Sequence, residues 1–149
     1  FRFNKTELMF AKGESFLNDP FQQILADFFP RYLKIITNKK YREDILEVRI
    51  EGHTSSSWLG AASEDDAYIY NMALSQARTR STLAYVLDLP DVRLQKIWLR
   101  KHLTANGLSS AKVIKNKVGE ENSEQSRRVE FKVRTDAEGK IATILEDVL

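Results

Sequence analysis

The strongest hydrophobic pattern in this sequence lies between residues 19 and 36. Asp19 followed by Pro20 is a favourable helix start, with Asp19 as the N-cap and Pro20 as the first helical residue. Apolar side chains then recur at helical spacing, at Phe21, Ile24, Leu25, Phe28, Phe29, Tyr32, Leu33 and Ile36. Such a wide apolar stripe predicts a helix that packs on the core of the domain.

Two other segments alternate between apolar and polar residues, the period of a strand with one buried face. The first contains Leu46, Val48 and Ile50 and is expected to end at Gly52. The second spans residues 127–134 and carries Val129, Phe131 and Val133. Shorter strands are expected at residues 8–10, where three apolar residues adjoin, and near residues 101–105.

A second long helix is predicted over residues 67–87, before Pro90. It follows a loop over residues 55–67, in which Asp65 or Asp66 is the expected N-cap. A short helix is expected at residues 91–100, and its apolar side is assigned to Val92, Leu94, Ile97 and Trp98. Residues 141–149 fit either a short helix or a frayed tail.

The order strand, helix, strand, helix, strand, strand predicts an α/β (α+β) two-layer sandwich with the helices on one face of a mixed sheet. The length of 149 residues and the hydrophobic content of 42% suit a single domain over residues 1–149. The chain begins at Phe1 and contains no run of 18 apolar residues. We therefore expect a soluble domain excised from a longer protein, whose upstream anchor, if it has one, lies outside this sequence.

Composition argues against several classes of function. Lys and Arg total 23 against 21 Asp and Glu, and they are spread along the chain, so no nucleic-acid partner is expected. The absence of cysteine excludes thiolate catalysis, and His53 and His102 lack metal-ligand spacing, so neither a metal nor another cofactor is predicted. His53 and Ser55 stand two apart on one strand and cannot form a catalytic pair, so no enzyme activity is expected.

Polar side chains share one stripe of the second long helix. Asn71, Leu74, Ser75 and Arg78 stand at helical spacing near its start, and Thr54 follows the strand that ends beside it. Arginine donates two parallel hydrogen bonds to a carboxylate, so the stripe can hold a small polar ligand. The alternative is that Arg78 pairs with an acid of the fold, such as Glu51.

Trp58 lies in the polar loop and allows two interpretations. It either folds back onto the helix or contacts a partner protein.

Three motifs occur in order along the chain: Gly52-His53-Thr54, then Tyr70-Asn71-x-x-Leu74-Ser75-x-x-Arg78, and finally Arg127-Arg128-Val129-Glu130. Together they resemble the OmpA C-terminal-like domain, which outer-membrane proteins, Pal lipoproteins and MotB-type motor stators share. Residues 8–17 are similar to its opening strand. The resemblance implies an OmpA-C-like β-α-β-α-β-β fold and non-catalytic binding of the diaminopimelate-containing stem peptide of peptidoglycan.

The resemblance also implies roles for individual residues. Arg78 would bind the ligand carboxylate, Asn71 and the backbone near Thr54 its polar groups, and Leu74 its aliphatic stem. The other residues of the implied site are Ser55, Tyr70, Arg127 and Arg128. Ser55 stands where the family has an aspartate that meets the ligand's ammonium, and we expect Glu64, Asp65 or Asp66 to restore that charge.

The long first helix and the segment around Trp98 resemble the MotB subgroup, including the related subunit of Zorya anti-phage systems. That subgroup implies a periplasmic domain with an inner-membrane anchor, a MotA-like membrane partner and a homodimer. An outer-membrane lipoprotein or barrel tail is the alternative. The rival functional hypothesis, based on Ser55 and Trp58, is a protein-interaction module that has lost wall binding.

Overall fold

Within residues 1–136, a mixed four-stranded sheet forms the frame of the fold. The computed structural model describes residues 1–136 and 146. In spatial order the strands are β1 (Arg2–Phe3), β4 (Arg128–Thr135), β2 (Ile45–His53) and β3 (Leu103–Gly107). Strand β3 runs parallel to β2, whereas β4 is antiparallel to both β1 and β2. The predicted mixed sheet is thereby confirmed.

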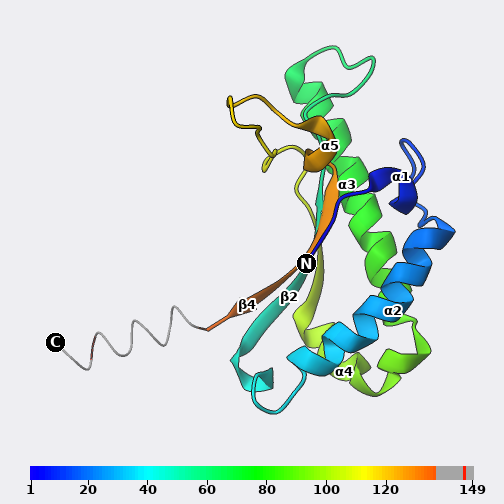
Figure 1. Cartoon of the computed structure of the whole chain (residues 1–149), viewed down its shortest axis with the longest axis vertical. Helices are drawn as coiled ribbons and strands as arrows, with labels where there is room; N and C mark the ends of the chain where they lie inside the picture. Colours follow the sequence, from blue (N-terminus) through cyan, green and yellow to red (C-terminus); the bar gives the residue numbers. More distant parts are fainter. Residues whose placement is uncertain (137–145, 147–149) are drawn as a thin grey trace.

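The helices that cover this sheet lie on one of its faces (Figure 1). The long ones are α2 (Asp19–Ile36) and α3 (Glu64–Leu87). The shorter helices along the chain are α1 (Thr6–Met9), η1 (Arg42–Asp44), η2 (Pro90–Gln95), α4 (Lys96–His102) and α5 (Ser123–Ser126), and not all of these cover that face. Within the described residues, no helix combines the length and apolar character that crossing a bilayer requires.

The core lies between α2 and the inner face of the sheet. Val48 and Ile50 of β2 are fully buried, as are Phe21 and Phe29 of α2. Phe131 of β4 packs its ring 6.0 Å from that of Phe29. The apolar stripe and the alternating strands predicted from the sequence therefore face one another across a single core.

The outer face of the sheet carries interleaved charges. Glu51 accepts hydrogen bonds from Arg49 and His53, and the Lys132 ammonium lies 3.0 Å from its carboxylate. The Glu130 carboxylate pairs with Arg128 at 2.6 Å. Burial by itself would raise the pKa of Glu130, but the hydrogen bonds and charges of Arg128 and Lys132 outweigh it and lower the pKa to about 2.

The N-terminal segment differs from the prediction. Residues 8–10 are not a strand of the sheet: the chain forms the single turn α1, and the sheet begins earlier, at β1. The turn buries Met9, and Phe10 makes an isolated bridge with Leu17 that closes a loop through Gly13, whose φ is +72°. Met9 and Phe10 thus reach the core from a turn, whereas Leu8 is 42% exposed.

Other boundaries shift by a few residues. Helix α3 begins at Glu64, because the Ser63 hydroxyl caps it by accepting a hydrogen bond from the Asp66 N–H. Strand β2 extends through Gly52 to His53. The apolar assignment of Leu94 and Ile97 is wrong, since their exposed fractions are 93% and 68%. Residues 141–149 fall outside the described residues, apart from Glu146.

Candidate functional site

Two glycines allow α3 to lie directly on the strand ends. A Cβ at Gly107 would stand 2.4 Å from the backbone nitrogen of Gln76, and one at Gly52 would stand 2.7 Å from Cγ2 of Thr79. Glycine within a strand often marks such a close backbone approach. The contact sets the polar stripe of α3 against the end of β2, as the sequence predicted.

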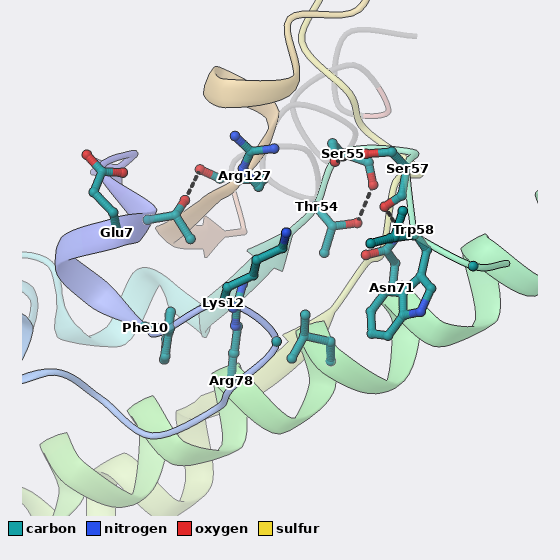
Figure 2. Close-up of a pocket in the computed structure, with 15 residues that line it drawn as sticks. Glu7, Phe10, Lys12, Thr54, Ser55, Ser57, Trp58, Asn71, Arg78 and Arg127 are labelled. Carbon is teal, nitrogen blue, oxygen red and sulfur yellow. Dashed lines mark hydrogen bonds between the residues drawn. The ribbon is translucent and has the colours of Figure 1, made fainter.

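A groove of about 1140 Å³ opens beside this contact (Figure 2). Its walls come from the N-terminal segment, the loop that follows β2, and α3. The predicted residues that line it are Thr54, Ser55, Asn71, Leu74, Arg78 and Arg127. The structure adds Thr6, Glu7, Phe10, Lys12, Gly13, Ser57, Trp58, Leu59 and Gly60. The predicted residues Tyr70 and Arg128 do not line it.

Arg78 is the most buried cation of the groove, with an exposed fraction of 8%. Its Nε donates to the Glu14 carbonyl at 2.8 Å and its Nη2 to the Ala11 carbonyl at 3.3 Å. The guanidinium also lies 4.8 Å from the Phe10 ring centroid. The alternative that Arg78 pairs with Glu51 is wrong, because no carboxylate among the described residues bridges it and Glu51 binds other partners.

Burial, together with the smaller effect of the nearby charge of Arg127, lowers the pKa of Arg78 to about 10. The guanidinium therefore remains protonated at neutral pH. Its Nη1 has no hydrogen-bond acceptor among the described residues. A buried charge without an opposite charge is unfavourable, so this side chain is suited to an anionic ligand.

The loop after β2 is held by hydrogen bonds from three directions. The Thr54 N–H donates to the Ser109 carbonyl at 2.9 Å, and Nδ2 of Asn71 donates to the Ser57 carbonyl at 3.1 Å. The N–H and hydroxyl of Ser56 both donate to the carboxylate of Glu121, at 2.8 and 2.6 Å. Asn71 thus fixes the wall of the groove as well as lining it.

The aromatic residues of the loop and helix meet at the rim. The rings of Trp58 and Tyr70 lie 5.5 Å apart, and Tyr70 is 46% exposed. Trp58 therefore folds back onto α3, the first of the two interpretations that the sequence allowed, and it also lines the groove. Leu59 beside it remains 92% exposed.

Arg128 has a different environment from Arg127. Its guanidinium donates to the carboxylate of Glu130 and to the carbonyl oxygens of Ser126 and Lys112. These bonds tie β4 to the segment before it, with Arg128 only 6% exposed. Arg127 lines the groove, and its carbonyl accepts a hydrogen bond from the Thr6 hydroxyl at 2.8 Å.

The sequence did not predict the N-terminal wall of the groove. Glu7 and Lys12 flank residues 8–10, which were expected to be a strand, and they line the groove because α1 turns the chain beside α3. The acids expected to restore the charge at Ser55, residues 64–66, lie in the first turn of α3 and do not line the groove. Gly13, whose positive φ suits a tight turn, was the feature of the sequence that could have indicated that the chain turns back here.

The relatives of this chain are consistent with this geometry. No protein-family model matches the chain. The chain is 47% identical over 146 residues to the Zorya protein ZorB of Escherichia coli (Crooks strain). The aligned region covers 98% of this chain and 61% of that protein, so the chain spans less than two thirds of that relative.

Among solved structures, a protein of Desulfovibrio vulgaris described as MotB-like is 25% identical with a TM-score of 0.58, over 90% of this chain and 73% of that one. The periplasmic domain of Helicobacter pylori MotB has a TM-score of 0.59 at 17% identity, over 99% and 84% of the two chains. The chain has the OmpA-like, MotB-like fold.

One further cluster of this MotB-like domain resembles a metal site. Ligand atoms of Glu51, His53 and Glu130 lie within 4.8 Å of one another on the outer face of the sheet. The Lys132 ammonium stands 3.0 Å from Glu51 and 3.3 Å from Glu130, so it already supplies the positive charge that a metal ion would bring. We therefore assign this cluster to the ion pairs of the sheet.

Proposed function

We propose that this domain binds the diaminopimelate-containing stem peptide of peptidoglycan without breaking a bond. The observation that carries the proposal is Arg78, a buried and protonated guanidinium at the groove that has no carboxylate partner among the described residues. A free carboxylate of the stem peptide would supply the missing negative charge, and the fork of the guanidinium suits it.

The rest of the groove fits the same ligand. Leu74 is half-buried and offers an apolar surface to an aliphatic stem. Asn71 lines the groove as well; its Nδ2 holds the Ser57 carbonyl, which leaves its Oδ1 as the atom that can accept a hydrogen bond from the ligand. Binding without catalysis is supported by the partners of His53 and Ser55, which do not bond each other as a base and a nucleophile would. His53 bonds Glu51 at 3.2 Å, and the Ser55 hydroxyl bonds that of Ser57.

The similarity to ZorB and to MotB domains supports a wider role. We propose that the domain is the periplasmic part of an inner-membrane protein that anchors a MotB-like, ion-driven stator complex to the cell wall in anti-phage defence. A MotA-like membrane subunit and a second copy of this chain are the proposed partners.

The test is co-sedimentation of the domain with purified diaminopimelate-type sacculi. Arg78→Ala should abolish retention, because loss of a charge-assisted pair of hydrogen bonds costs about 2–3 kcal/mol, roughly 30-fold to 150-fold in affinity. Arg80→Ala is the matched control, since Arg80 lies on the same helix with an exposed side chain. Soluble diaminopimelate should compete with the parent protein.

Equal retention of Arg78→Ala and the parent would refute the assignment of this groove. Failure of the parent to bind sacculi would favour the second candidate, a protein-interaction module. That candidate is supported by Leu59, which is 92% exposed next to Trp58. Weaker binding of a partner protein by Trp58→Ala would then identify the interacting surface.

A further inference from the structure

The charges that line the groove are unequal in number. Among the described residues that line it, Lys12, Arg78 and Arg127 are cations and Glu7 is the one carboxylate. Diaminopimelate in an uncross-linked stem peptide carries both a free carboxylate and a free ammonium. The cations account for the carboxylate, whereas recognition of the ammonium requires a negative or strongly accepting group.

We propose that Glu7 recognises the free ammonium of diaminopimelate, in place of an acid at position 55. This inference rests on the proposed function, and it names the chemical form of the ligand that the groove selects. Ser55 at the strand end is neutral, 4% exposed, and its hydroxyl is already engaged with that of Ser57. A neutral hydroxyl provides a weaker partner for an ammonium than a carboxylate does.

Other nearby acids are engaged elsewhere. The Glu121 carboxylate accepts two hydrogen bonds from Ser56 and holds the loop. Glu51 and Glu130 pair with cations on the outer face of the sheet. Glu14 contributes its backbone carbonyl to Arg78, and its side chain does not line the groove. Within the described residues, Glu7 is therefore the carboxylate best placed to meet the ligand.

The segment that carries Glu7 is tied to the cationic side of the groove. The Thr6 hydroxyl donates to the Arg127 carbonyl at 2.8 Å, and Nδ2 of Asn18 donates to the Glu7 carbonyl at 3.3 Å. Figure 2 shows Glu7 on α1, at the end of the groove opposite Trp58. The Glu7 side chain is exposed, so it can change rotamer at small cost when an ammonium enters.

Cross-linking removes the positive charge that Glu7 is proposed to bind. In a stem that is cross-linked through this nitrogen, the nitrogen forms an amide bond and carries no charge. A groove that uses Glu7 in this way binds uncross-linked stems in preference to cross-linked ones. Because Glu7 is exposed, the effect is that of a surface ion pair, about fivefold in affinity.

The experiment compares two soluble ligands by calorimetry: the stem tripeptide ending in diaminopimelate, and the same tripeptide with its free side-chain amine acetylated. The parent domain should bind the free amine about fivefold more tightly. Glu7→Gln should bind both ligands equally, because the amide keeps the shape of the side chain and removes its charge. Glu14→Gln, the matched control from the same segment, should behave as the parent.

A second variant separates charge from local shape. Adding Ser55→Asp to Glu7→Gln should restore the preference for the free amine, since it returns a carboxylate to the strand end. A preference that persists unchanged in Glu7→Gln would overturn this inference and leave the proposed function standing. Binding of neither ligand by the folded parent domain would overturn the proposed function, and the inference with it.

Discussion

Replacement of Gly107 by alanine tests whether the contact between α3 and the sheet is rigid enough to position the groove. The added Cβ would lie 2.4 Å from the Gln76 nitrogen and 2.7 Å from its Cα, whereas ordinary contact begins at 3.4 Å. These atoms belong to the helix backbone, so no change of rotamer relieves the overlap. Helix α3 must therefore move away from β3 by about 1 Å.

Overpacking of a well-packed contact costs about 1–3 kcal/mol, and backbone displacement places this change at the upper end. We expect Gly107→Ala to lower the free energy of unfolding by about 3 kcal/mol in urea denaturation. Binding to sacculi should weaken as well, because Asn71 and Arg78 move with the helix while Thr54 stays with the sheet.

Gly119→Ala provides the control for backbone conformation. Gly119 has a φ of +84°, and apart from its chain neighbours no described residue has an atom within 4 Å of the added Cβ, so alanine there costs about 1–2 kcal/mol through its left-handed conformation alone. If Gly107→Ala destabilises the domain by less than Gly119→Ala, α3 yields easily to the added methyl group, and close packing does not position the groove.

Two further predictions concern buried polar groups. Glu130, with its pKa lowered to about 2, stabilises the fold above the unfolded pKa of about 4.3 and loses that contribution as the pH falls towards 2. The free energy of unfolding of Glu130→Gln should be about 2 kcal/mol below that of the parent at pH 7, and this difference should shrink by pH 3. A difference that stays the same at both pH values would contradict the prediction. Ser75→Ala should lower the free energy of unfolding by about 1–3 kcal/mol, because the buried Ser109 N–H loses the Ser75 hydroxyl as its acceptor. Hydrogen exchange of the Ser109 amide should then accelerate, and an unchanged exchange rate would count against this role of Ser75.

The elements with strong periodicity could be predicted from the sequence. Helix α2 occupies residues 19–36, although its N-cap is Asn18 and not the predicted Asp19, and strands β2 and β4 follow the two alternating segments. Each pattern records which face of one element meets the core, so a local window contains the information. The stripe that carries Asn71 and Arg78 was predictable for the same reason, and both side chains line the groove.

The N-terminal wall could not be predicted in this way. A triplet of apolar residues fits a strand or a buried turn equally well, and what decides between them is a contact with a distant part of the chain. The Thr6 hydroxyl bonds the carbonyl of Arg127, and Arg78 bonds the carbonyls of Ala11 and Glu14. No local pattern contains these pairs.

Arg78 links the two halves of the site, and this has a consequence for how the groove works. Its Nε and Nη2 hold the carbonyls of Glu14 and Ala11, so the guanidinium builds the N-terminal wall on which Lys12 stands. The same group carries the buried positive charge, which has no carboxylate partner among the described residues. A ligand carboxylate that engages the guanidinium would stabilise the charge and the wall together. Ligand affinity and the stability of the N-terminal wall are therefore coupled through one side chain, so a ligand that binds Arg78 should also stabilise that wall.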